Sequence, residues 1–540
     1  LGVTGAGGAV IPASADVTGV ETVAITTGGA DTIDANIISG LTSISVTAAA
    51  DAHSIAATDV TTETFSVTTA DADAAGDDVI ALIDINLATT TGSADTINLT
   101  LTNADNDTAF TVTDIDSTND GVETLNLTLT QGVDIGTAGA ADIIISDFSS
   151  AYTTINISGD ADATIAGTTA TTTATVNAAT ATGALRFELG AANHTVTGGT
   201  GGDTFDFNGN LTSADTATGG DGTDTLIATI PASRISPTVT GIESATLDFD
   251  NAGTFAYTNV TGMTSLTLEG ANAHNVVNID NSLATVVLQE EAQDEAVTLT
   301  YDAGSDVALT IDFNEVTAAG TETYGLITVS NNAGDFTVDN SDGIWSVNDI
   351  VNASTTGQLK VMTSVDATTD TLTISGTTGI DAINATSVIY ETGGSDIIAS
   401  GAATHSYTDA TSLTFNALDG DININGNGEV VSDANVTVTM TASGGNDSDI
   451  DITDLDVDHV TTITATATNG SDILIDGEIV FLGVDSTTAA SDVSTVFTFE
   501  ADGDGSTVTI DDIAVDGAVT LDSLVLKSSN DGVVSFTATD

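Results

Sequence analysis

Short runs in which apolar and polar residues alternate cover almost the whole chain. Two of them, 94–103 (ADTINLTLTN) and 122–131 (VETLNLTLTQ), place Ile or Leu at every second position with Thr or Asn between them. A period of two is that of a β-strand with one buried face, and the Gly, Asn and Asp residues between the runs favour turns. Helical heptads are missing. The Glu to Lys pairs that would support exposed helices can hardly form, because the chain has almost no Lys. The sequence therefore predicts an all-β fold.

Internal similarity indicates how the strands are arranged. VTGVET at Val17 returns as ISGLTS at Ile38, and VTGIES at Val239 returns as VTGMTS at Val260, so that each pair is 21 residues apart. A repeat of about 20 residues suits one coil of a β-solenoid, in which each coil stacks on its neighbour and none folds alone. The pattern favours a β-solenoid or β-roll-like fold, and tandem β-sandwich domains with similar hairpins stay open as the alternative.

The repeats also suggest a division of the chain. With only 3 prolines there is no Pro-rich linker to mark a boundary. We expect an N-terminal β-repeat region over 1–183, a β-region over 184–345 with glycine-rich turns at 198–227, and a C-terminal β-repeat region over 346–540.

Charge excludes two classes of partner. The 540 residues include 78 Asp plus Glu against 4 Lys plus Arg, for a formal net charge of −74. Binding to nucleic acid or to anionic lipid depends on Lys and Arg, so neither partner is expected. No apolar run approaches the roughly 18 to 20 residues that cross a bilayer, so we expect no membrane insertion. Because 41% of the residues are hydrophobic, the chain can still bury a core.

The acidic residues are mostly aspartate. Of the 78 acids, 15 are Glu and 63 are Asp, and Asp is both a turn former and a short oxygen ligand. Four cations cannot neutralise this charge, which repels itself in a compact state. The chain has no Cys, so disulfides and thiolate metal sites are impossible. We expect the missing positive charge to be inorganic, in the form of several calcium ions.

Two glycine-rich segments are the best candidates for calcium turns. GGTGGDTFD at Gly198 and GGDGTDTLI at Gly219 both match Gly-Gly-x-Gly-x-Asp-x-apolar-x and are 21 residues apart. The glycines allow a tight turn with inward carbonyls, and the Asp supplies a carboxylate before the next strand. Calcium takes six to eight oxygens, so a neighbouring turn must complete the shell. We predict side-chain ligands at Asp203 and Asp224, with carbonyl ligands near Gly198, Thr200, Gly219 and Asp221.

Partial versions of the motif occur elsewhere. GGADTID at Gly28 and GGSDII at Gly393 make Asp31 and Asp396 further candidate calcium ligands. GGNDSDI at Gly444 and GSDILI at Gly470 keep the same order of glycine, turn, Asp and strand. The ordinary explanation of all four is a β-turn that leads into a strand, because Gly and Asp are the default turn residues.

A row of carboxylates marks the segment 449–458. Asp alternates with Ile, Leu or Val there, but the parity slips between Thr453 and Asp454. Such a slip predicts a bulge or bend in the strand. A cation along this row and a merely solvated acidic face both remain open.

The segment 184–230, which contains both full motifs, resembles the RTX (repeats-in-toxin) calcium-binding family of secreted Gram-negative proteins, and in particular its surface-layer (S-layer) members. The resemblance implies type I secretion, calcium-triggered folding outside the cell and assembly into a two-dimensional lattice. RTX motifs usually recur every nine residues, so a spacing of 21 predicts isolated calcium turns within a larger β architecture.

Enzyme signatures are missing from the sequence. There is no HExxH or GxSxG, and the chain has a single Trp and is 4% aromatic. We therefore expect a non-enzymatic protein, and the resemblance to RTX S-layer proteins implies an extracellular structural protein that folds with calcium and self-assembles into an S-layer, sheath or filament. The expected partners are copies of itself and cell-surface polysaccharide. The alternative is an adhesin or ligand-binding module, including an ice-binding type, against which the uneven spacing of Thr-x-Thr along the chain argues.

Overall fold

The computed structural model covers strands and connections in every part of the chain. The residues that the structure describes are 2–5, 17–27, 31–34, 38–39, 41–48, 53–60, 64–69, 79–89, 95–104, 109–117, 122–131, 141–149, 152–168, 175–289, 296–314, 322–323, 327–332, 336–340, 345–347, 350–352, 358–363, 371–374, 387–392, 396–400, 405–406, 412–418, 421–425, 429–431, 436–443, 449–458, 460–468, 472–482, 494–502, 506–516, 520–529 and 533–536.

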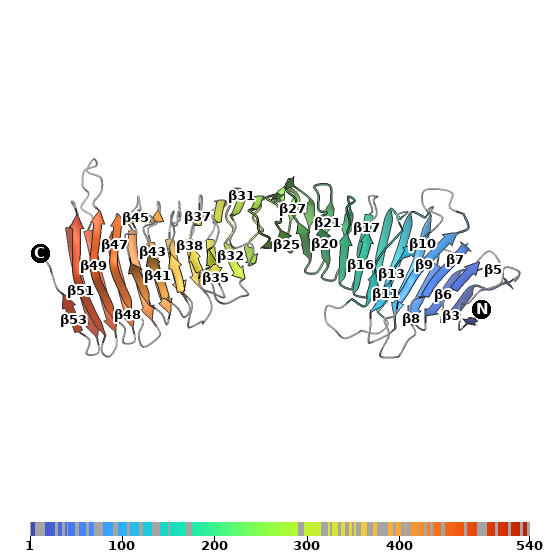
Figure 1. The fold of residues 1–540 in the computed structure, drawn as a ribbon, viewed down its shortest axis with the longest axis horizontal. Helices are drawn as coiled ribbons and strands as arrows, with labels where there is room; N and C mark the ends of the chain where they lie inside the picture. Colours follow the sequence, from blue (N-terminus) through green and yellow to red (C-terminus); the bar gives the residue numbers. More distant parts are fainter. Residues whose placement is uncertain are drawn as a thin grey trace. The chain divides into compact units, whose positions relative to one another are not determined.

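The chain folds as two compact units, each built almost wholly from short strands (Figure 1). The N-terminal unit comprises Leu1–Thr229, Ile235–Leu247 and Asn259–Met263, and the C-terminal unit comprises Ile230–Arg234, Asp248–Thr258 and Thr264–Asp540. Within the described residues the one helical element is the 3-10 turn η2 (Tyr257–Asn259). The all-β prediction is confirmed, and no helix in this described part is long and apolar enough to cross a membrane.

Two parallel sheets make up most of the N-terminal unit. Sheet 1 contains β1 (Gly2–Gly5), β3 (Thr22–Thr27), β6 (Ser43–Ala48), β8 (Thr64–Thr69), β10 (Thr96–Asn103), β13 (Thr124–Gln131), β15 (Thr154–Gly159), β17 (Thr175–Ala181), β19 (Thr195–Thr197), β21 (Thr216–Thr218), β24 (Thr238–Thr240) and β27 (Val260–Thr261). Sheet 2 contains β4 (Asp31–Asp34), β7 (His53–Val60), β9 (Val79–Leu87), β11 (Phe110–Val112), β12 (Ile115–Asp116), β14 (Ile143–Ile145), β16 (Ala163–Thr168), β18 (Leu185–Leu189), β20 (Thr204–Asn208), β22 (Thr225–Thr229) and β25 (Ser244–Asp248). The short strands β2 (Val17–Thr18) and β5 (Ile38–Ser39) pair separately.

The chain visits the two sheets in turn, so each coil contributes a strand to sheet 1 and then one to sheet 2. Every strand pair whose register the structure gives is parallel, for example β19 with β21 and β20 with β22. Parallel pairing between successive coils is the arrangement of a β-solenoid, whereas β-sandwiches pair antiparallel strands. The solenoid prediction is confirmed.

The predicted coil length is also confirmed in both places where the sequence repeats. Val17 of β2 pairs with Ile38 of β5, and Val239 of β24 pairs with Val260 of β27. These are the residue pairs that begin the two repeats, 21 residues apart. The repeated hexapeptides therefore occupy equivalent positions in neighbouring coils.

Inward positions of sheet 1 form a continuous apolar row. The row consists of seven side chains that are each no more than 2% exposed: Ile97, Leu125, Ile155, Val176, Val196, Ala217 and Val239. Sheet 2 adds larger groups, such as Phe187 and Phe205, whose rings stack with centroids 5.3 Å apart. Alternate residues therefore supply the core, which no coil could form alone.

The C-terminal unit repeats this arrangement of stacked parallel strands. Sheet 3 contains β28 (Ser265–Glu269), β30 (Thr285–Gln289), β32 (Leu309–Asn314), β35 (Phe336–Asn340), β38 (Gln358–Thr363), β40 (Ser387–Thr392), β43 (Ser412–Leu418), β46 (Val436–Ser443), β48 (Val460–Thr468), β50 (Ser494–Asp502) and β52 (Thr520–Ser529). Sheet 4 contains β23 (Arg234–Ile235), β26 (Thr254–Ala256), β29 (His274–Ile279), β31 (Val297–Ser305), β34 (Ile327–Asn332) and β37 (Ile350–Asn352).

A further sheet of the same unit follows along the chain. Sheet 5 contains β33 (Glu322–Thr323), β36 (Trp345–Val347), β39 (Thr371–Ile374), β41 (Asp396–Ser400), β42 (His405–Ser406), β44 (Ile422–Asn425), β45 (Glu429–Val431), β47 (Ile450–Asp458), β49 (Ile473–Leu482), β51 (Thr507–Asp516) and β53 (Val533–Phe536). The division into three regions that the sequence suggests stays a prediction.

The predicted irregularity in the carboxylate-rich segment is confirmed. The register between β47 and β49 shifts between Ile452 and Asp454, where the alternation of the sequence slips. On its other side β47 pairs first with β44 and then with β45. One long strand therefore spans two short ones. The extra residue at the shift lies in β49, which has two residues opposite Thr453, and beyond it Leu455 and Val457 pair with Ile479 and Phe481.

Candidate calcium-binding turns

Both full motifs form turns that lead from sheet 1 into sheet 2. The first turn joins β19 to β20 and the second joins β21 to β22 in the next coil. The turns stack directly, because the Gly198 amide donates to the Thr218 carbonyl at 2.8 Å and the Asp221 amide donates to the Gly199 carbonyl at 3.1 Å. The structure thus brings the two predicted motifs together, one coil apart.

The first glycine of each motif is required by how closely the coils approach. A Cβ atom on Gly219 would lie 1.8 Å from the Gly241 carbonyl oxygen and 2.2 Å from Asp224 Oδ2. A Cβ atom on Gly198 would lie 2.2 Å from the Gly219 carbonyl oxygen and 2.4 Å from Asp203 Oδ2. No side chain fits at either position. The glycines thus make room for the motif's own carboxylate and for a carbonyl of the following coil.

Asp203 is buried inside the first turn and is 1% exposed. Its Oδ1 accepts a hydrogen bond from the Leu185 amide at 2.8 Å, and its Oδ2 accepts one from the Gly199 amide at 2.5 Å. Burial raises the pKa of this carboxyl to about 6, against the opposing effect of the two amides. The ionised form is therefore poorly solvated at this position.

Asp224 holds the equivalent position in the second turn and is fully buried. Its Oδ1 accepts a hydrogen bond from the Asp203 amide at 2.7 Å, whereas its buried Oδ2 has no hydrogen-bond partner among the described residues. Burial also raises the pKa of this carboxyl, and the nearby Glu243 adds to the shift. A buried carboxylate oxygen without a donor is costly, and a bound cation would relieve that cost.

The donor chemistry fits calcium only if the backbone contributes. Within the described part of the chain, no three His, Asp or Glu side chains gather into a metal-binding group. Carbonyl oxygens must therefore fill most of a calcium shell, as the sequence predicts. Of the predicted carbonyl donors, Gly198 and Gly219 are buried at the inner side of the turns, while Thr200 and Asp221 lie at their exposed tips. The Gly219 carbonyl faces the preceding turn at Gly198.

Asp203 and Asp224 belong to a longer series of acidic side chains that accept hydrogen bonds from backbone amides of the adjacent coil. We call this series a carboxylate ladder, and the sequence did not reveal it. Below the motifs, the Ala184 amide donates to Asp162 Oδ1 at 2.7 Å. Above them, the Asp224 amide donates to Glu243 Oε2 at 2.8 Å. The Ala184 amide binds Asp162 of the preceding coil, whereas the Leu185 amide binds Asp203 of the following coil. The direction of hydrogen bonding along the ladder therefore reverses between these two residues. Each acid thereby ties two coils together.

Two of the partial motifs take part in a second ladder in the C-terminal unit. The Asp472 amide donates to Asp449 Oδ1 at 2.7 Å, and the Thr507 amide donates to Asp472 Oδ1 at 2.6 Å. The Asp449 amide in turn donates to Asp421 Oδ1 at 2.9 Å. Asp449 and Asp472 come from GGNDSDI and GSDILI, so the shared order of turn, Asp and strand does mark a shared position. Calcium binding there stays a prediction.

The remaining predicted ligands are placed only by their backbones. Asp31 is the first residue of β4 and Asp396 is the first residue of β41. Each therefore begins a strand, whereas Asp203 and Asp224 each lie one residue before the strand that follows them. Their side chains and the glycines before them lie outside the described residues.

A buried acid without a glycine motif lies at the other end of the same coils. Asp215 Oδ1 accepts the His194 amide at 2.7 Å, and its Oδ2 accepts the amide and the hydroxyl of Thr212 at 2.7 and 2.8 Å. Burial lowers the pKa of the neighbouring His194, which is fully buried. The sequence around it, TSAD, lacks a glycine pair, so nothing singled out this acid. Asp215 is fully partnered and provides a natural reference for Asp224.

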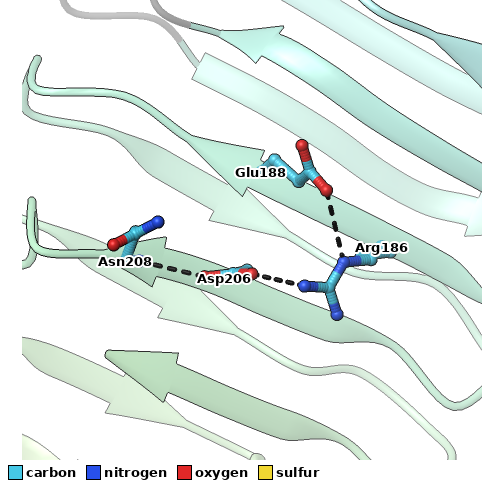
Figure 2. A network of polar contacts seen from close by, with 4 residues as sticks. All are labelled: Arg186, Glu188, Asp206 and Asn208. Carbon is cyan, nitrogen blue, oxygen red and sulfur yellow. Dashed lines mark hydrogen bonds and ion pairs between the residues drawn. The ribbon is translucent and has the colours of Figure 1, made fainter. Parts of the chain in front are cut away.

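Basic residues offset little of this charge. Figure 2 shows Arg186 of β18 between Glu188 on its own strand, at 3.5 Å, and Asp206 of β20, whose other oxygen accepts the Asn208 amide at 3.0 Å. Lys527 pairs with Glu500 at 3.1 Å in the C-terminal unit. These pairs lie on exposed sheet faces, where an ion pair contributes little to stability. None of them reaches the buried carboxylates of the turns.

Comparison with known proteins adds no relative to this picture. No family model matches the chain, and no characterised protein or solved structure is significantly similar to it.

Proposed function

We propose that the chain is a non-enzymatic, extracellular structural protein that folds with calcium and assembles with copies of itself into an S-layer, sheath or filament. In this proposal the chain leaves the cell unfolded, by type I secretion, and folds where calcium is abundant. Calcium then occupies the turns at Asp203 and Asp224 and screens the acidic coils. Cell-surface polysaccharide would anchor the assembly.

The observation that carries the proposal is the buried, unpartnered Asp224 Oδ2 in the second of two stacked turns. Proteins seldom bury a carboxylate oxygen without a donor or a cation. The glycines beside it keep side chains away and bring carbonyl oxygens close. A hard cation that prefers oxygen ligands supplies what the turn lacks.

Net charge supports the same conclusion at the scale of the whole chain. With 78 acids and 4 basic side chains, the molecule repels itself when compact and repels its copies when they approach. Salt bridges between copies are nearly impossible with so few Lys and Arg residues. Assembly would have to use calcium bridges, uncharged faces or pairing of strand edges. Each of these contacts needs either bound calcium or a surface that carries no net charge.

Electron microscopy of the purified chain tests this function. We expect ordered sheets or filaments in millimolar calcium and none in excess chelator, because calcium both completes the turns and screens the repulsion between copies. Magnesium at the same ionic strength is the control, since it seldom accepts a shell made mostly of protein carbonyls. Single molecules in calcium and in chelator alike would reject assembly and favour the adhesin alternative.

A further inference from the structure

The outward face of sheet 1 carries threonine in a regular row. Seven successive strands, from β10 to β24, place a threonine at the same position in register. This first row consists of Thr96, Thr124, Thr154, Thr175, Thr195, Thr216 and Thr238. All seven side chains are exposed or half-buried.

A second row runs beside the first, two residues further along each strand. It consists of Asn98, Asn126, Asn156, Asn177, Thr197, Thr218, Thr240 and Thr261. The asparagines are fixed by hydrogen bonds along the row, since Asn126 Nδ2 donates to Asn98 Oδ1 at 2.7 Å and Asn156 Nδ2 donates to Asn126 Oδ1 at 2.8 Å. The face therefore presents an ordered two-dimensional array of small polar groups.

Uneven spacing in the sequence does not disturb these rows. Thr96 pairs with Thr124, and Thr124 pairs with Thr154, although more residues separate them than separate Thr195 from Thr216. The additional residues fall between strands, so the register within the sheet is kept. Uneven spacing along the chain therefore leaves the register of both rows in sheet 1 intact, with Thr-x-Asn in β10 to β17 and Thr-x-Thr in β19 to β24.

This face is also free of charge in a very acidic protein. Outward positions of β10 to β27 hold only Thr, Asn, Ser and Ala within the strands that the structure describes. The outward face of sheet 2 differs, because it carries Arg186, Glu188 and Asp206 (Figure 2). Acids are thus kept off one face of the solenoid and allowed on the other.

The chemistry of the face limits what it could bind. Charged ligands find no counter-charge on it, and it lacks the aromatic, Met and Arg side chains that enrich the core of protein interfaces. Small molecules bind in concave sites, whereas this is an open sheet face. What remains is an extended, uncharged partner that matches a lattice of hydroxyl and methyl groups.

The spacing of the array points to crystalline water. Side chains two residues apart on a strand are separated by about 6.7 Å, and equivalent side chains on neighbouring strands by about 4.8 Å. Both repeats are close to distances between oxygen atoms on faces of an ice crystal. We propose that the two rows on sheet 1 form an ice-binding surface, in which threonine hydroxyls and methyls hold water in the arrangement of the crystal.

This activity goes beyond the proposed structural role and uses a different part of the coils from the calcium turns. Its test measures how the full chain, kept in calcium, changes the growth of ice crystals held just below their melting point. Thr216→Lys places a long charged side chain in the middle of the first row. Thr246→Lys places the same side chain on β25 in sheet 2, where the original threonine is equally half-buried, and serves as the matched control.

We expect the unmodified chain and Thr246→Lys to arrest or reshape crystal growth and Thr216→Lys to lose this effect, while all three melt at similar temperatures. The proposal is overturned if the unmodified chain leaves ice growth unchanged, or if Thr216→Lys acts as strongly as the control. It is equally overturned if Thr216→Lys instead abolishes self-association or binding to an insoluble polysaccharide, with no change in ice growth. None of these outcomes depends on whether calcium drives assembly.

Discussion

Replacing Asp224 with Asn is expected to remove most of the stability that calcium gives the N-terminal unit, while the metal-free protein stays at least as stable as before. Asn keeps an oxygen that can accept the Asp203 amide, now at 2.7 Å from Asp224 Oδ1. It replaces the unpartnered, buried Oδ2 with an uncharged group. Because burial raises the pKa of the Asp224 carboxyl, its ionised form destabilises the metal-free fold at neutral pH.

The size of the effect follows from binding linkage. A ligand at 100 times its dissociation constant stabilises the folded state by about 2.7 kcal/mol, and this increment vanishes when the ligand no longer binds. Thermal or urea unfolding, measured in calcium and in chelator for both proteins, gives the increment directly. An Asp224→Asn protein that keeps the full calcium increment would show that this carboxylate is not a ligand.

Asp215→Asn is the matched control for this experiment. Asp215 is also buried and also accepts an amide 21 residues earlier, but its second oxygen has two donors from Thr212. Asn has only one oxygen and cannot accept the His194 amide on one side and the two Thr212 donors on the other, so we expect the free energy of unfolding to fall by about 1–3 kcal/mol. The loss should be the same in calcium and in chelator. A change in the calcium increment here would mean that the effect at Asp224 is not specific to the motif.

Gly219→Ala is expected to produce the largest loss of stability of any conservative substitution in the turns. The added methyl would lie 1.8 Å from the Gly241 carbonyl oxygen and 2.2 Å from Asp224 Oδ2, so the two coils must separate to admit it. Overpacking of this kind costs about 3 kcal/mol or more, and the separation also takes the carboxylate away from its amide donor. Urea unfolding followed by circular dichroism measures the loss.

Gly209→Ala tells this steric effect apart from a general intolerance of alanine in the loops. A Cβ atom on Gly209 would meet nothing within 4 Å, so its substitution should change stability by no more than about 0.5 kcal/mol. If Gly219→Ala unfolds at the same urea concentration as Gly209→Ala, the second turn does not lie as close to the Gly241 carbonyl as the steric argument requires.

The fold follows from the sequence because a parallel solenoid repeats its chemistry at a fixed interval. The pairs Val17 with Ile38 and Val239 with Val260 start the two repeats of the sequence, and they are register partners in the sheets. The slip of parity at Thr453 likewise falls where the register between β47 and β49 shifts. Each of these signals is local, and parallel stacking turns it into a contact.

The hydrogen-bond partners of the acids could not be predicted in the same way. Asp203 binds the Leu185 amide of the preceding coil, whereas Asp449 binds the Asp472 amide of the following coil. The choice depends on how each carboxylate is rotated in its turn, which residue order does not encode. The threonine rows were missed for another reason, because insertions between strands change the spacing along the chain and leave the register intact.

The unfolding temperature of the unmodified chain in millimolar calcium and in excess chelator tests the central claim most directly. If calcium completes the turns at Asp203 and Asp224, the chain unfolds at a clearly higher temperature in calcium, and the difference grows with calcium concentration as binding linkage requires. Equal unfolding temperatures in calcium and in chelator would contradict the account, because the buried carboxylates would then be held without a metal.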